Sequence, residues 1–254
     1  MIEALALAGG NVEGSCIRRQ DDVALIATEL PLRIFNQVLV DGDGATPAAI
    51  TSAVELTRER GDRFFVSLRA GPDDGLIPLM SQLGLVPLSD EPWLPGMALA
   101  PLPDGAPAAL PGYEIRPATD ASGLEDHILT CAGGFDMQLD WLRAIMGTSL
   151  LEHPDATVYV GYADDQPVAT GFGLRVGRTI GIYNISTLPT ARKRGYGQAM
   201  TMRIVADGAA AGCDVATLEA SEMGYPIYTR LGFRTVSEYV GYVDPTSIAP
   251  APAS

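Results

Sequence analysis

At 254 residues with 47% apolar side chains, the chain is long enough for one large domain or two small ones with packed cores. Its 31 acidic and 17 basic side chains give a net charge of -14, which argues against a nucleic-acid or anionic-membrane partner and favours cationic small molecules. No segment approaches the roughly 20 consecutive apolar residues of a membrane span, and the opening lacks a signal-peptide pattern. We therefore expect a cytoplasmic protein.

Composition divides the chain into two domains. Residues 98–112 are crowded with proline, glycine and alanine, which is typical of a linker. The segment from Pro245 onward has too few bulky apolar residues to pack. The predicted division is an N-terminal domain at 1–105, a linker at 106–112, a C-terminal domain at 113–245 and a flexible tail at 246–254.

The C-terminal half predicts alternating strands and helices. A strand at 113–118 precedes helices at 121–131 and 139–151, and a hairpin of strands at 157–163 and 166–176 turns at Asp164 and Asp165. The pattern continues with a strand at 179–188, a helix at 195–211, a strand at 214–221, a short helix at 224–232 and a strand at 233–243. This order predicts a mixed α/β fold.

The N-terminal half repeats part of this pattern. The sequence FNQVLV at 35–40 aligns with YNISTL at 183–188, which pairs Asn36 with Asn184. A helix opened by Thr46 and Pro47 follows, then VSLRA at 66–70 aligns with ATLEA at 216–220, and Leu-Gly-Leu at 83–85 aligns with Leu-Gly-Phe at 231–233. The ordered series predicts two copies of one scaffold.

The turn between the strand at 179–188 and the next helix suits a phosphate group. It has the form R-x-x-G-x-G, read from Arg192 to Gly197. Glycines let the backbone approach an anion, and the free N–H groups and dipole of a helix N-terminus attract it. The segment lacks the Gly-Lys-Ser/Thr of a P-loop and the second βαβ unit of a dinucleotide site.

This segment resembles the coenzyme A loop of the GNAT N-acetyltransferase superfamily, and the resemblance extends over about 113–243. The family also ends in a strand, a short helix carrying a tyrosine and a Leu-Gly-Phe step, which here are the residues from Leu218 to Phe233. The resemblance implies two tandem GNAT-like domains with mixed, mostly antiparallel sheets flanked by helices. It also implies an acyltransferase that uses acetyl-CoA as cosubstrate and acetylates a primary amine, a small molecule or an amino acid, by direct attack.

The same resemblance implies the site residues. Tyr228 would be a catalytic residue near the sulfur of the cofactor, and backbone groups at Ile185, Ser186 and Thr187 would pair with its pantetheine arm. Ser221 stands where the family usually has asparagine, so that cofactor contact departs from the pattern. The pyrophosphate would bind to the segment made of Arg192, Lys193, Arg194, Gly195, Tyr196, Gly197, Gln198 and Ala199.

The residue that takes the proton of the attacking amine is less well defined by the sequence. Glu219 and Glu222 follow the strand at 214–221 near the expected cleft, whereas Asp136 and Asp140 lie in the helical region that usually forms the acceptor site. We assign the catalytic carboxylate to Glu222 and keep the other three as alternatives.

The N-terminal copy is predicted to be degenerate and non-catalytic. It has Asp41-Gly-Asp43-Gly where the C-terminal copy has its basic turn, and carboxylates repel a pyrophosphate. Met80 stands in the place of Tyr228 and cannot donate a proton. We hypothesise that this copy packs against the active one and helps shape the acceptor cleft.

Other readings remain open. A non-catalytic acyl-CoA-binding regulatory module would keep the phosphate turn, and a self-resistance enzyme would act on one dedicated compound. We expect no metal site, because His127 and His153 lack partners at ligand spacing and Cys16, Cys131 and Cys213 are scattered. The oligomeric state is not fixed by the sequence, with a homodimer among the options.

Overall fold

The computed structural model describes residues 2–61, 63–89, 94–103, 105 and 109–247. The chain forms two compact units. The C-terminal unit is Gly96–Val236, and the N-terminal unit is Ile2–Pro95 together with Ser237–Ser254. Residues 106–108 of the predicted linker at 106–112 and residues 248–254 of the predicted tail at 246–254 lie outside the described residues. Among the residues that are described, no helix is long and apolar enough to cross a membrane.

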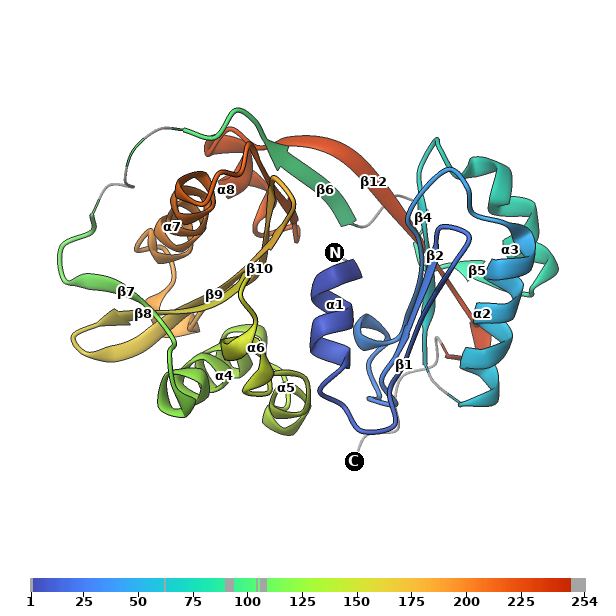
Figure 1. The fold of residues 1–254 in the computed structure, drawn as a ribbon, viewed down its shortest axis with the longest axis horizontal. Coiled ribbons are helices and arrows are strands. Elements are labelled where there is room, and N and C mark those ends of the chain that lie inside the picture. The colour runs from blue at the N-terminus through green and yellow to red at the C-terminus, as the bar shows by residue number, and fades with distance from the viewer. Residues whose placement is uncertain (1, 62, 90–93, 104, 106–108, 248–254) are drawn as a thin grey trace. The chain divides into compact units, whose positions relative to one another are not determined.

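The C-terminal unit is a mixed sheet with helices on both faces. Its strand order is β6-β11-β10-β9-β8-β7, and only β10 and β11 run parallel. Helices α7 and α4 pack on opposite faces of β9 and β10 (Figure 1). The elements are β6 (Leu94–Leu99), β7 (Tyr113–Pro117), α4 (Ala121–Phe135), α5 (Leu139–Ile145), α6 (Ser149–Glu152), β8 (Ala156–Ala163), β9 (Gln166–Val176), β10 (Thr179–Thr187), α7 (Tyr196–Ala210), β11 (Val215–Glu219) and α8 (Tyr225–Arg230).

The N-terminal unit has the same kind of architecture. Its strand order is β1-β2-β3-β4-β12, with β5 paired to β12, and only β3 and β4 run parallel. The elements are α1 (Ile2–Gly9), β1 (Cys16–Gln20), β2 (Val23–Ala27), β3 (Gln37–Val40), α2 (Pro47–Glu59), β4 (Phe65–Arg69), α3 (Ile77–Gln82), β5 (Val86–Pro87) and β12 (Arg234–Val243). The predicted fold class, with mixed and mostly antiparallel sheets flanked by helices, is confirmed.

Each unit is completed by a strand from the other half of the sequence. Strand β6 pairs with β11, and strand β12 pairs with β4 (Figure 1). The exchanged strands carry core side chains: Met97 is 1% exposed among the residues packed on α7, and Tyr242 is 7% exposed in the N-terminal core. The units therefore differ from the predicted contiguous segments, and residues 98 and 99, at the start of the proline- and glycine-rich segment 98–112, belong to a strand.

Two local predictions also need correction. The helix predicted at 139–151 is two helices, because Met146 leaves the helical region of the backbone after α5. In the proposed repeat, Val38 pairs with Val66 as Ile180 pairs with Ala216, so Val38 takes the place of Ile180 and not that of Ser186. The shift arises because β10 runs far beyond its parallel pairing, whereas β3 ends soon after it.

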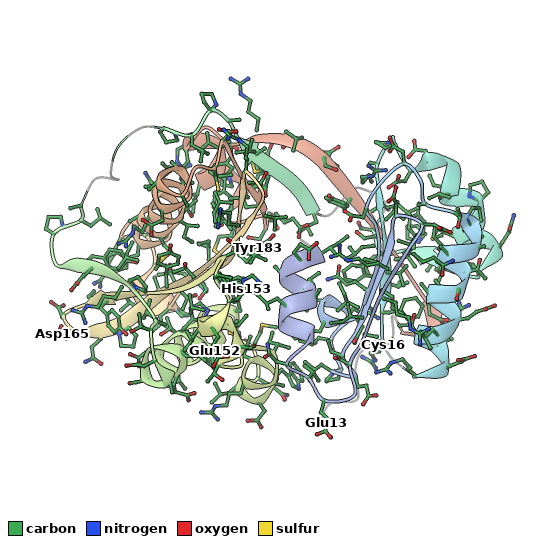
Figure 2. All side chains as sticks on the ribbon, in the orientation of Figure 1. Glu13, Cys16, Glu152, His153, Asp165 and Tyr183 are labelled. Carbon is green, nitrogen blue, oxygen red and sulfur yellow. The ribbon has the colours of Figure 1, made fainter. Side chains whose placement is uncertain are left out.

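Other local predictions are confirmed. Thr46 caps α2 through a hydrogen bond from the Ala49 N–H, and Pro47 occupies the first turn. Helices α3 and α8 both carry proline in their first turn, and each is followed by a glycine with positive φ, Gly84 and Gly232. The hairpin between β8 and β9 turns at Asp164 and Asp165, both with positive φ (Figure 2).

The exchange of strands gives a testable pair of substitutions. Met97→Ala and Met80→Ala each delete a side chain that is at most 1% exposed, which costs about 2–5 kcal/mol for such a residue. We expect Met97→Ala to accelerate amide hydrogen exchange in β10 and β11, and Met80→Ala to accelerate it in β3 and β4. An effect of Met97→Ala confined to β3 and β4 would contradict the assignment of β6 to the C-terminal core.

Candidate functional site

The parallel strands β10 and β11 separate partway along their length. Their pairing covers only Thr179–Gly181 with Val215–Thr217. Strand β10 then continues to Thr187, and β11 continues to Glu219. The edge of β10 that faces β11 therefore has no strand partner over this last stretch, and such an edge can accept an extended ligand through main-chain hydrogen bonds.

A β-bulge in β10 accompanies this separation. The register against β9 shifts between Tyr183 and Ser186, and Asn184 has a φ of 53°. The Thr170 hydroxyl donates to the Asn184 carbonyl at 2.8 Å. A bulge bends the strand that carries it and redirects its backbone groups. The bulge is thus the local cause that turns the end of β10 away from regular pairing.

The backbone of Thr187 points toward the open edge. The Leu188 N–H donates to the Val168 carbonyl on β9 at 3.0 Å. Because alternate residues of an antiparallel ladder direct their N–H and C=O groups to opposite edges, those of Thr187 point away from β9. The Thr187 carbonyl indeed accepts from Arg192 Nε at 3.2 Å, while its N–H remains directed at the open edge.

The side chain of Ser186 contacts helix α4, which packs on one face of the sheet. Its side chain is 5% exposed, accepts a hydrogen bond from the Thr170 hydroxyl at 3.1 Å and donates to the Thr130 carbonyl of α4. The side chain of Ser186 is therefore committed to the contact with α4.

The segment 188–199, called the phosphate loop below after its predicted role, runs into an uncapped helix. Gly195 is the N-cap of α7 with a φ of 85°, and no side chain caps this terminus. The first hydrogen bond of the helix runs from the Ala199 N–H to the Gly195 carbonyl at 2.9 Å. The N–H groups of Tyr196, Gly197 and Gln198 thus have no partner within the helix, and they and the dipole make an anion site.

The three basic residues of the loop are not equivalent. All three are exposed, and no ion pair involves Lys193 or Arg194 in the part of the chain that the structure describes. Lys193 also has a positive φ of 64°. The Arg192 guanidinium instead donates from Nη2 to the Gly134 carbonyl at 2.8 Å and from Nε to Thr187. Lys193 and Arg194 are the side chains available to an anion.

Tyr196 is held by its ring. The ring stacks on Tyr113 of β7 with centroids 4.2 Å apart and an interplanar angle of 13°. Burial raises the pKa of Tyr113 far above its usual range. The side chain of Tyr196 therefore anchors the first turn of α7 to β7, and only its backbone N–H is part of the anion site.

Tyr228 presents a protonated hydroxyl. Its ring is 8% exposed and contacts Phe233 edge-on at 6.0 Å. Burial raises the pKa of Tyr228 to about 12, so the hydroxyl keeps its proton at neutral pH. None of the hydrogen bonds found among the described residues involves this hydroxyl, which leaves it able to donate to a ligand.

The acidic candidates separate by burial. Glu219 is the last residue of β11 and pairs with Gly96 of β6, and burial raises the pKa of Glu219 to about 7. Glu222, the residue assigned from the sequence, is exposed in the following turn. Ser221 is also exposed, and its hydroxyl accepts a hydrogen bond from the Gly224 N–H at 3.2 Å, so its side chain stabilises the turn before α8.

The corresponding part of the N-terminal unit is closed. The Asp22 carboxylate accepts from the Gly44 N–H at 2.9 Å, and the Thr46 hydroxyl caps α2. Asp43 forms an ion pair with Arg69 at 3.0 Å. Met80 is fully buried in the core. The donors that would meet an anion are occupied by the unit's own side chains, and Asp22 was not identified from the sequence because it precedes the aligned segments.

Two glycines near the site were not identified as important from the sequence. Gly133 and Gly134 lie inside α4, which runs to Phe135 instead of ending near Cys131 as predicted. A glycine pair inside a helix costs helix stability, so its presence signals a close approach by another element. At Gly134 a Cβ atom would lie 2.3 Å from Ser186 Oγ.

The histidines have ordinary structural contacts. His127 is 1% exposed, its Nδ1 lies 2.9 Å from the Tyr159 carbonyl, and burial lowers its pKa to about 4. His153, after α6, accepts a hydrogen bond at Nδ1 from the Asp155 N–H (Figure 2). Within the described ranges, no group of three or more His, Cys, Asp or Glu side chains is arranged to hold a metal ion.

Comparisons with known proteins identify the domain and the fold. Residues 123–225 match the model of the acetyltransferase (GNAT) domain. The comparison with curated protein sequences gave no match.

Solved structures resemble the chain over both units. A GCN5-related N-acetyltransferase from Kribbella flavida is 18% identical with a TM-score of 0.70, and the match covers 96% of this chain and 94% of that one. A tandem GNAT protein from the clavulanic acid biosynthesis pathway is 13% identical with a TM-score of 0.65, covering 94% and 86%. A GCN5-related N-acetyltransferase from Sphaerobacter thermophilus is 20% identical with a TM-score of 0.61, covering 91% and 82%. At these identities the likeness shows the fold.

The two glycines of the phosphate loop should respond differently to alanine. Gly195→Ala forces a φ of 85° on an L-residue, which costs about 1–2 kcal/mol. At Gly197 a Cβ atom would meet Thr187 Oγ1 at 3.6 Å, an ordinary contact in the first turn of a helix. We expect urea unfolding to show a loss of stability for Gly195→Ala and none for Gly197→Ala. Equal losses would contradict the left-handed cap.

Proposed function

Because residues 123–225 match the model of the acetyltransferase (GNAT) domain, we propose that this chain transfers the acetyl group of acetyl-CoA directly to a primary amine. The observation that carries the proposal is the open edge of β10, which leads to the uncapped N-terminus of α7. An extended arm with an anionic end fits these two features together, since one offers main-chain pairing and the other offers free N–H groups.

The residues of the phosphate loop would hold the pyrophosphate. The N–H groups of Tyr196, Gly197 and Gln198 donate to its oxygens, and the exposed Lys193 and Arg194 add positive charge in an otherwise acidic protein. The Thr187 N–H at the open edge pairs with the pantetheine arm. Bound acetyl-CoA supplies the thioester carbonyl that the amine attacks.

Glu219 is the proposed proton acceptor. Attack forms a bond from the amine nitrogen to the acetyl carbon and breaks the carbon–sulfur bond, so the nitrogen loses a proton and the sulfur leaves as a thiolate. A base works best with a pKa near the working pH, and the pKa of Glu219, about 7, meets this condition. Glu219 thus replaces Glu222 as the preferred candidate, and the protonated Tyr228 hydroxyl serves the departing sulfur.

The acceptor is proposed to be a small cationic amine or an amino acid. The net charge of -14 favours such a molecule over one bound to nucleic acid. A non-catalytic acyl-CoA-binding regulatory module is the second candidate, because the phosphate loop alone would serve it equally well. The half-buried Glu219, with its raised pKa, favours the enzyme, since a module that only binds has no use for a base.

The N-terminal unit is proposed to bind no cofactor. Its parallel strands stay paired close to the end of β3, and Asp22 and Thr46 occupy the donors that an anion would need. The chain then has one cofactor site. Compartment and assembly remain as expected from the sequence, a cytoplasmic protein with a homodimer among the options.

Calorimetric titration with acetyl-CoA tests the binding site. We expect one equivalent to bind per chain, with affinity falling as salt rises. Removing the charges of Lys193 and Arg194 by alanine substitution should weaken binding at least about tenfold, because charge-assisted contacts are worth about 1.5–3 kcal/mol each. The control variant replaces Arg18 and Arg19, exposed on β1, and removes the same charge. Two equivalents, or no binding, would contradict the proposal.

The pH dependence of turnover tests the base. Glu219 must be ionised to accept a proton, so kcat/KM should rise with pH through about 7 and then level off. Glu219→Gln should lower the rate by about 10²–10⁴-fold and remove this rise, whereas Glu222→Gln, three residues away and exposed, should keep both. The measurement is acetyl-CoA consumption across an amine panel. A loss in Glu222→Gln alone would restore the assignment made from the sequence.

A further inference from the structure

The last turn of α4 packs directly on the end of β10. A Cβ atom at Gly134 would lie 2.3 Å from Ser186 Oγ, and one at Gly133 would lie 2.8 Å from Leu188 Cδ2. Only glycine allows backbone and neighbouring side chains to come this close. The end of the helix and the start of the phosphate loop therefore form one joint.

Arg192 closes this joint. Gly134 is among the last residues of α4, whose carbonyls have no partner within the helix, and its carbonyl accepts from Arg192 Nη2 at 2.8 Å. A cation at a helix C-terminus is also favoured by the helix dipole. The same guanidinium holds the Thr187 carbonyl through Nε at 3.2 Å. One rigid planar group thus bridges α4, β10 and the loop.

The bridge lies beside a tightly turned segment. Asp136 follows α4 with a φ of 55°, and both its N–H and that of Met137 donate to the Ala132 carbonyl. The segment then enters α5 at Leu139. Because Arg192 holds the Gly134 carbonyl, it also sets the position of the start of this turn relative to the open edge of β10.

We infer that Arg192 is a positioning residue, which sets the α4–α5 turn against the phosphate loop, and is not a ligand of the pyrophosphate. The inference deepens the proposed function and rests on it in one respect: the occupant of the loop is acetyl-CoA. Cofactor at the loop then stabilises the turn at 136–138 through the guanidinium of Arg192.

The two roles of Arg192 make opposite demands on a lysine. A phosphate ligand can be replaced by lysine, because an ammonium group binds phosphate as a point charge. A bridge to two carbonyls cannot, because it needs the planar fork of the guanidinium. Arg192→Lys is therefore the informative variant, and Arg194→Lys is its matched control in the same loop.

The experiment is amide hydrogen exchange of the full chain, first without ligand. Arg192→Lys and Arg192→Ala should both accelerate exchange at 132–138 by about tenfold or more, a size typical of local opening, with the N-terminal unit unchanged as the internal control for folding. Arg194→Lys and Arg194→Ala should leave 132–138 as in the wild type. Wild-type exchange at 132–138 in Arg192→Lys would overturn the inference.

The second arm adds saturating coenzyme A. The wild type and Arg194→Lys should gain protection at both 188–199 and 132–138, whereas Arg192→Lys should bind the ligand and gain protection only at 188–199. Equal protection of 132–138 in Arg192→Lys would overturn the inference. Failure of the wild type to bind coenzyme A would refute the proposed function, and the ligand-free comparison would still decide the role of Arg192.

Discussion

The site depends on the parting of two parallel strands. Buried or edge N–H and C=O groups require a hydrogen-bond partner, and an ordinary parallel pair supplies these groups along its whole length. In the C-terminal unit the pairing ends at Gly181 and Thr217, although β10 runs on to Thr187. The unpaired stretch can be satisfied by water or by a ligand that imitates a strand, and it leads straight to the N-terminus of α7.

In the N-terminal unit, side chains of the unit itself accept hydrogen bonds from the corresponding backbone N–H groups. Thr46 caps α2 where Gly195 leaves α7 uncapped, and the Asp22 carboxylate accepts from the Gly44 N–H. Both units hold left-handed backbone, at Asp22 in the N-terminal unit and at Asn184 and Lys193 in the C-terminal unit, so backbone strain does not distinguish them. The difference lies in the side-chain cap, which α2 has and α7 lacks.

The fold class and the glycine turn that starts α7 were readable from the sequence, because alternation, helical spacing and glycine chemistry are local signals. Thr46, Asp164 and Asp165 follow such rules and take the predicted roles. Contacts between residues far apart in the sequence could not be predicted. No local pattern indicates that Met97 packs in the core of the C-terminal unit, or that the Arg192 guanidinium donates to the Gly134 carbonyl. The choice between Glu219 and Glu222 as the base is likewise not readable from the sequence, since the two residues differ in burial and not in type.

The exchange of strands also supplies the strand neighbour of the residue that is proposed as the base. Glu219 ends β11, and its register partner is Gly96 of β6, a strand that precedes the C-terminal elements in the sequence. A hydrated glutamate has a pKa near 4.3, too low for an efficient base at neutral pH. Desolvation is the main cause of the raised pKa of Glu219, and the role proposed for this residue depends on that shift.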